Sequence, residues 1–150
     1  MPSYGGYENT SVVLGDAEEL RQKLREFEAQ YAKHKALTKT FWQRAYEIME
    51  ANHWNSAIFR ERTQLNEKTY RRAKSNYHSI PDIRTVIAIC AGLDLDIFLT
   101  NELLGLAGHT LNNSLEHQAY GFVITGFHGK TIHERNEFLW ALNIMPLGSK

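Results

Sequence analysis

The stretch from Asn55 to Asp96 constrains the fold most, because it begins with two short helices separated by a sharp break. Apolar residues followed by arginines predict a helix over residues 56–62, and Thr63-Gln64-Leu65 makes a tight connection. Asn66 is a good N-cap residue, since its side-chain oxygen can accept a hydrogen bond from an unpaired backbone N–H. It therefore predicts the start of a second helix over residues 67–74.

A loop over residues 75–81 and an apolar helix over residues 82–91 complete this stretch. We expect Asp82 near the start of the apolar helix, where its carboxylate is favoured by the positive end of the helix dipole. Two short helices joined by a turn of three or four residues, the second starting polar and basic, are the pattern of a DNA-reading helix-turn-helix.

The run LNEKTYRRAKSNYHSIPDIRTVIAICAGLDLD resembles the phage repressor and Cro-like helix-turn-helix family, the XRE-type regulators, and the resemblance extends over roughly residues 41–108. It consists of a capped recognition helix, a short loop with Pro81, an apolar helix and the turn Gly92-Leu93-Asp94-Leu95. The resemblance implies an all-α, repressor-like helix-turn-helix bundle, in which residues 41–52 supply the first helix.

Two positions depart from the family's pattern. Arg60 stands where the family usually has a small alanine, and Gln64 stands where the turn often has glycine. Because residues other than glycine tolerate a positive φ poorly, we expect the turn at Gln64 to be built differently here.

The candidate DNA-contacting residues follow from the resemblance, since the first residues of a recognition helix face base edges and later ones meet phosphates. The predicted base contacts are Glu67, Lys68 and Arg71. The predicted contacts to the sugar-phosphate backbone are Ser56, which also reaches a base in some family members, Arg72, Lys74, Asn76 and Tyr77. Tyr70 and Ala73 are expected to point inward.

Charge is concentrated in the same region. The whole chain has a formal net charge of zero, but residues 55–85 carry seven basic side chains against three acidic ones. Residues 86–150 carry three basic and six acidic side chains. A focused basic patch on a neutral protein suits contact with phosphates without indiscriminate binding.

The N-terminal part divides into a flexible lead-in over residues 1–15 and an amphipathic helix over residues 16–37, capped by Asp16. An apolar stripe on this helix repeats at alternating three- and four-residue spacing and consists of Ala17, Leu20, Leu24, Phe27, Tyr31 and His34. The stripe is shorter than three heptads, which argues against an autonomous coiled coil. Packing against the body of the same chain and packing against a second copy both remain open.

The helix-turn-helix domain is predicted over residues 38–108, beginning its first helix at Thr38 or Thr40, with Trp54 in its core. Residues 109–150 are expected to form a small helical appendage with helices starting at Ser114 and at the capping box Thr131–Glu134. For the core, this segment offers Leu115, Ala119, Phe122, Val123, Phe127, Ile132, Phe138, Leu139 and Leu142.

We expect a homodimer, because one helix-turn-helix unit covers only about half of a typical operator. Trp140 lies well away from Phe138 and Leu142 around its helix, and exposed tryptophan is common at interface centres. The sequence therefore favours an interface formed by residues after Gly108 over one formed by the N-terminal stripe. It also predicts that a chain without residues 110–150 folds as a monomer.

The motifs that would indicate an enzyme or a metal site are incomplete in this sequence. His133-Glu134 begins like a zinc-protease motif, but Glu137 stands where the second histidine is required. Cys90 lies in an apolar run without an activating neighbour, so we expect an inert buried thiol. We expect no enzyme activity, no metal, no cofactor and no membrane segment, and a cytoplasmic location.

The sequence thus predicts a DNA-binding transcriptional regulator with double-stranded DNA as its partner, acting as a repressor or an activator. The alternative is a protein-interaction module, such as an antitoxin-type or phage-defence-type adaptor, which keeps the helix-turn-helix fold and binds a protein partner without reading DNA. The acidic C-terminal half and Arg60 favour this alternative.

Overall fold

A computed structural model describes residues 16–148 of the chain, so the lead-in predicted over residues 1–15 lies outside the described residues. Within the described range every regular element is a helix, which confirms the all-α class. No described helix has both the length and the apolar character needed to cross a membrane. The chain divides into two compact units, Met1–Lys39 and Thr40–Lys150, and each is described by itself below.

The first unit contains the helix α2 (Ala17–Leu37). Asp16 caps it as predicted, because its Oδ1 accepts a hydrogen bond of 2.8 Å from the backbone N–H of Glu19. None of the side chains of α2 is buried, so the whole apolar stripe is exposed. The helix has 21 residues, close to the predicted range of 16–37, and the apolar stripe on it ends at His34.

The second unit contains the helices α3 (Phe41–Ala51), α4 (Ser56–Thr63), α5 (Glu67–Lys74), α6 (Ile83–Gly92), α7 (Ile97–Leu106), α8 (Leu115–Thr125) and α9 (Ile132–Ala141). Each begins behind a residue whose side chain accepts a backbone N–H, which satisfies one of the unpaired donors of the first turn. The predicted caps Asn66, Ser114 and Thr131 are confirmed, and Thr40, not Thr38, starts α3.

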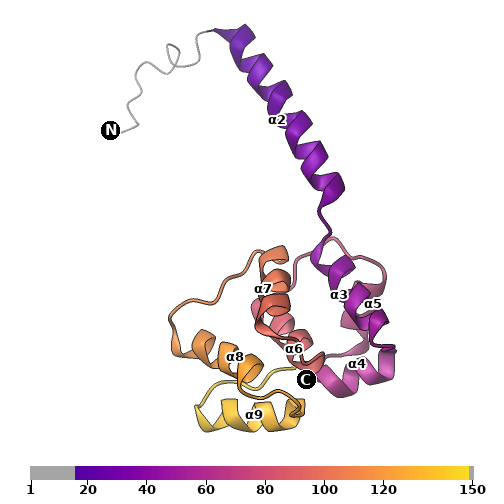
Figure 1. Cartoon of the computed structure of the whole chain (residues 1–150), viewed down its shortest axis with the longest axis vertical. Coiled ribbons are helices and arrows are strands. Elements are labelled where there is room, and N and C mark those ends of the chain that lie inside the picture. The colour runs from indigo at the N-terminus through magenta and orange to yellow at the C-terminus, as the bar shows by residue number, and fades with distance from the viewer. Residues whose placement is uncertain (1–15, 149–150) are drawn as a thin grey trace. The chain divides into compact units, whose positions relative to one another are not determined.

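The apolar helix α6 lies at the centre of the second unit, with α4 and α5 on one side and α8 and α9 on the other (Figure 1). It packs against α4, α7, α8 and α9, and six consecutive residues from Val86 to Ala91 are buried. Cys90 and Trp54 are buried, as the sequence predicted. Burying both faces of one helix requires covering helices on both sides, which explains why the elements after Gly108 share this core.

Two of the predicted core residues in α8 are on the surface instead. The exposed fractions of Leu115 and Phe122 are 64% and 51%, whereas Ala119 and Val123 are buried as expected. A helix presents only one stripe to its neighbours, and the buried stripe here also takes Tyr120 and Ile124.

Buried Arg135 fastens α9 to the core, which the sequence did not predict because arginine is rarely fully buried. Its guanidinium donates hydrogen bonds to the carbonyl oxygens of Ala91 and Phe127 and to Oδ1 of Asp94, the last at 2.8 Å. Burial opposes the charge on Asp94, but the hydrogen bonds from Arg135, the Gly129 N–H and His128 outweigh it and lower its pKa.

The last described residues are also held in place. The side chain of Asn136 exchanges two hydrogen bonds with the backbone of Leu147, and Arg84 donates one to the carbonyl of Pro146. Gly148 has a φ of +103° and lies so close to the α4–α5 turn that a Cβ on it would be 2.5 Å from the Cβ of Gln64. Gly148 thus packs directly on that turn.

Candidate nucleic-acid interface

The connection between α4 and α5 is a tight turn centred on Gln64. This residue caps the C-terminus of α4 in the left-handed conformation, with a φ of 60° and a ψ of 18°. The expectation of a differently built turn is therefore wrong, because Gln64 adopts the positive φ for which glycine is usually chosen. Buried Thr63 supports the turn, since its hydroxyl donates to the carbonyl of Phe59 and accepts from the N–H of Leu65.

Helix α5 has one buried and one exposed face. Thr69, Tyr70 and Ala73 are buried, which confirms the inward orientation predicted for Tyr70 and Ala73. The ring of Tyr70 packs on that of Phe59 in α4, with 5.3 Å between the ring centroids. Since this contact fixes the rotation of α5 about its axis, all its charged side chains are on the outside.

The three predicted base-contacting residues lie together on the exposed face. Glu67 and Lys68 occupy the first turn of α5, and Arg71 follows one turn later. At 3.6 residues per turn, Arg71 falls in the middle of the exposed face, between Lys74 on one side and Lys68 on the other. Its Nη1 lies 3.3 Å from Oε2 of Glu67, so these two side chains form an ion pair along the helix.

The predicted backbone-contacting residues differ in their surroundings. Lys74 and Arg72 are exposed, and the guanidinium of Arg72 lies over the ring of Tyr77, 5.4 Å from its centroid. Asn76 has a positive φ of 54° and its Oδ1 accepts a hydrogen bond of 2.6 Å from the hydroxyl of Thr40. Ser56, the first residue of α4, is partly exposed.

The loop after α5 is anchored at three points, and no sequence pattern predicted these contacts. Besides the bond between Thr40 and Asn76, Nε1 of Trp42 donates to the carbonyl of Ser79 at 2.7 Å. The Nε2 of His109 lies 2.8 Å from the carbonyl oxygen of Pro81. These anchors hold Tyr77 beside the end of α5.

Six basic side chains are exposed on or next to the α4–α5 pair, and they are Arg60, Arg62, Lys68, Arg71, Arg72 and Lys74. Two acidic side chains, Glu61 and Glu67, lie among them. Arg84, which the charge count also included, is half-buried and bonded to the C-terminal segment. The surface is therefore strongly positive, which is the electrostatic requirement for phosphate contact.

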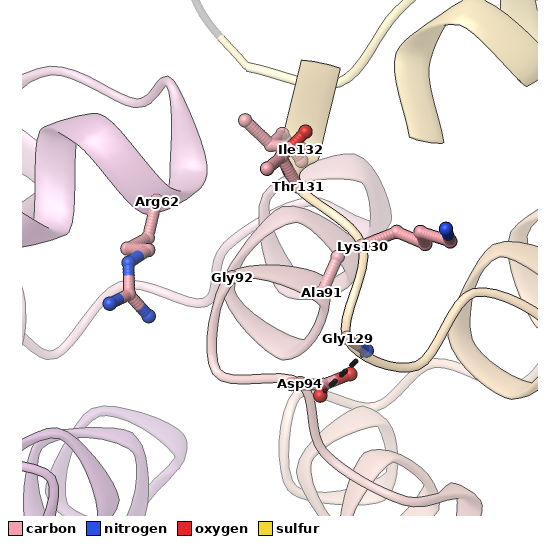
Figure 2. A pocket seen from close by; sticks show the side chains of 8 residues that line it. All are labelled: Arg62, Ala91, Gly92, Asp94, Gly129, Lys130, Thr131 and Ile132. Atoms are coloured by element: carbon pink, nitrogen blue, oxygen red, sulfur yellow. Dashed lines mark hydrogen bonds between the residues drawn. The ribbon is translucent and has the colours of Figure 1, made fainter. Parts of the chain in front are cut away.

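A hollow of about 360 Å³ lies nearby, between the end of α4, the end of α6 and the segment before α9. Figure 2 shows Arg62 and Lys130 extending on opposite sides of the end of α6, so the two cations do not converge on one point. Asp94 crosses the hollow to accept a hydrogen bond of 3.0 Å from the N–H of Gly129. Asp94 is thus engaged by its neighbours and the two cations point apart, so the basic surface of α4 and α5 is the stronger candidate site.

The rest of the described chain offers little reactive chemistry. Burial raises the pKa of the Cys90 thiol to about 12, so this residue is a protonated core side chain at neutral pH. Within residues 16–148, no three histidine, cysteine, aspartate or glutamate side chains gather as a metal site would require. Compared with known proteins, the chain matches no family model, no curated protein and no solved structure.

Proposed function

We propose that this protein is a sequence-specific, double-stranded DNA-binding transcriptional regulator of the repressor-like, Cro- and XRE-type helix-turn-helix kind. It acts as a homodimer and places α5 in the major groove. The observation that carries this proposal is the exposed basic face of α5, which is fixed by the buried Tyr70 and by the left-handed turn at Gln64. A rigid helix with outward-facing Lys and Arg side chains suits base readout.

Base recognition falls to the first two turns of α5. Arg71 has the planar guanidinium that binds O6 and N7 of guanine, and Lys68 addresses the same atoms as a point charge. Glu67 can accept a hydrogen bond from N4 of cytosine. The ion pair between Glu67 and Arg71 keeps the two side chains ordered before binding, and each exchanges its partner for a base edge on the DNA.

The phosphate contacts come from residues around the exposed face of α5. Arg72, Lys74 and Tyr77 lie at the far end of α5, while Ser56 lies at the start of α4. Asn76 already uses its side-chain oxygen to accept the bond from Thr40, which leaves its amide nitrogen as the donor for a phosphate oxygen. Such contacts orient the protein without reading the sequence.

The test is a mobility-shift selection of the full-length chain on a random double-stranded DNA library, followed by sequencing of the retained DNA. We expect one enriched motif. Lys68, Arg71, Arg72 and Lys74 supply four basic contacts per chain, so the logarithm of affinity should fall with the logarithm of salt concentration with a slope of about −3.5 per chain, and about twice that for the dimer. Lys74→Ala should make the slope shallower by about 0.9, and Lys130→Ala, an equal charge change away from this face, should not alter it.

The opposite result would favour the adaptor alternative. If the chain retains no DNA above background at low salt, or if Lys74→Ala and Lys130→Ala weaken retention equally, α5 does not contact DNA. A helix-turn-helix that binds a protein partner would then be the better description of this surface.

A further inference from the structure

Helix α2 carries an apolar stripe that its own unit leaves uncovered. In heptad notation, Ala17, Leu24 and Tyr31 occupy a positions, while Leu20, Phe27 and His34 occupy d positions. The exposed fractions are 43% for Leu20, 52% for Leu24, 63% for Phe27 and 53% for Tyr31. Four large apolar side chains in one line are a coiled-coil seam and not the scattered exposure of an ordinary surface.

The charges beside the seam decide which partner fits it. The e positions hold Arg21, Glu28 and Lys35, and the g positions hold Asp16, Lys23 and Gln30. In a parallel pair of helices, each g residue faces the e residue five positions later on the partner. A second copy of α2 therefore brings Lys23 to Glu28 twice, with no like-charge pair. It also brings Asp16, the N-cap residue just before α2, near Arg21, with one carboxylate oxygen of Asp16 already bonded to the N–H of Glu19.

The antiparallel alternative fits less well. There, e residues flank e residues and g residues flank g residues. Overlap of all three heptads sets Arg21 opposite Glu28, an attractive pair made twice, and Lys23 opposite Gln30. Lys23 then has no acidic neighbour on the partner. Parallel pairing gives both Arg21 and Lys23 an acidic neighbour, whereas antiparallel pairing does so only for Arg21, and this difference favours the parallel arrangement in register.

We infer that α2 forms a parallel, in-register, two-stranded coiled coil with α2 of a second copy of this chain. The inference specifies the surface of the homodimer in the proposed function, and it rests on that proposal only for its use on DNA. The sequence favours an interface after Gly108 instead. In that segment Ile132, Leu139, Ile144 and Leu147 are buried in the chain's own core, whereas Trp140 is 69% exposed. The charge variants of α2 described below distinguish the two interfaces, because they leave the surface around Trp140 unchanged.

The first test is sedimentation of the full-length chain without DNA, so that failure here is distinguishable from failure to bind DNA. Lys23→Glu and Glu28→Lys should each weaken the dimer about tenfold, because each turns two attractive pairs into repulsive ones. The double variant Lys23→Glu/Glu28→Lys should restore the dimer, since the interchain pairs are rebuilt with opposite signs. Lys33→Glu, at a c position facing solvent, should leave the dimer unchanged.

The double variant also separates pairing from damage to the helix. Lys23 pairs with Glu26 along its own helix, and both Lys23→Glu variants lose that contact. Restored association in the double variant therefore reports the contact between chains. A wild-type chain that is monomeric at about 100 μM, or a Lys23→Glu variant that associates as tightly as the wild type, overturns the inference.

Orientation is tested with Ala17→Cys, which places a thiol at an a position near one end of the seam. In the parallel dimer the two thiols are adjacent and should form an interchain disulfide on mild oxidation. In an antiparallel dimer they lie at opposite ends of α2, about 25–30 Å apart, far beyond the roughly 7 Å between Cα atoms that a disulfide can bridge. The native Cys90 is buried and does not compete.

The matched control is Ala29→Cys, at an f position on the far side of the helix, which should remain largely unlinked. Equal cross-linking of both variants, or none from Ala17→Cys in a sample that sediments as a dimer, contradicts parallel pairing.

Discussion

The guanidinium of Arg71 lies 3.3 Å from the carboxylate of Glu67, one helical turn earlier on the exposed face of α5. Because both side chains are more than half exposed, solvent screens this pair and it contributes little to folding. The pair matters instead for DNA recognition, because Arg71 and Glu67 must each give up this contact to bind a base.

Arg71→Ala should lose about 1–3 kcal/mol of binding free energy on the preferred DNA site and relax selection at one base pair, because it removes a two-bond contact to guanine. Lys74→Ala should weaken binding to all sequences about equally. Affinities of both variants on the selected site and on its single-base substitutions measure the difference. Identical profiles for the two variants would refute our division between base and phosphate contacts.

Glu67→Gln should strengthen binding to random DNA, whereas Lys74→Ala should weaken it. Removing a negative charge from the basic face should tighten non-specific binding about two- to fivefold, because Arg71 no longer has a competing partner and repulsion from phosphates falls. Selection at the base pair that Glu67 reads should decline at the same time. The measurement is the ratio of specific to non-specific affinity at one fixed salt concentration, and an unchanged ratio would exclude Glu67 from base readout.

Asn66→Ala should lower the free energy of unfolding by about 1 kcal/mol, because the N–H of Thr69 loses the bond of 3.1 Å to the Asn66 side chain. Asn66→Gly should cost only a few tenths of a kcal/mol, because glycine is a tolerated N-cap. Urea denaturation of the two variants provides the comparison. Equal losses would mean that the side-chain bond does not stabilise the start of α5.

Gly92→Ala should destabilise the protein by about 1–3 kcal/mol, because its Cβ would lie 2.8 Å from the carbonyl oxygen of Arg62, where α4 approaches α6. Gly105→Ala is the matched control, since nothing lies within 4 Å of the added atom in α7. It should stabilise the protein by about 0.5–1 kcal/mol, as expected for glycine replaced in a helix. Thermal unfolding should therefore shift in opposite directions, and a shared direction would contradict the close approach at Gly92.

Asp94→Asn should lower the free energy of unfolding by about 1–2 kcal/mol at neutral pH, because it leaves buried Arg135 without a countercharge. The Asp94 side chain is 43% exposed, so solvent screening keeps this loss below that of a fully buried pair. Asparagine tolerates the left-handed φ of 54° at this position, so backbone strain does not confuse the result.

The same variant gives a pH prediction. Since folding lowers the pKa of Asp94, its carboxylate contributes fully at pH values above its ordinary pKa of 3.8 and loses this contribution as the pH falls through the folded value. The difference between wild type and Asp94→Asn should therefore be constant near neutral pH and shrink below about pH 3.8. Asp96→Asn is the matched control at neutral pH, because it removes a charge from the same turn but keeps an N-cap, and it should change the free energy of unfolding little.

Sequence reasoning located most helices of the second unit because their starts depend on local chemistry. Asn66, Ser114 and Thr131 each accept a backbone N–H within three residues, and that preference can be read from the sequence. The inward orientation of Tyr70 and Ala73 was predicted from the resemblance to repressor-like helix-turn-helix proteins, and both residues are buried.

What could not be predicted depends on contacts between distant segments. Buried Arg135 bonds to Ala91 and Asp94, more than forty residues earlier, and no local pattern distinguishes it from a surface arginine. Leu115 and Phe122 looked like core residues by polarity alone, but the direction from which α6 and α7 cover α8 decides which stripe is buried. Among the candidate site residues, Asn76 accepts such a long-range hydrogen bond from Thr40, which lies 36 residues earlier.

The close approach of Gly148 to Gln64 has a practical consequence for how the protein is labelled. Gly148 lies beside the α4–α5 turn, next to the surface proposed to meet DNA. A carboxyl-terminal affinity tag or fusion partner would therefore obstruct binding assays, whereas a small fluorophore at that end would report on them.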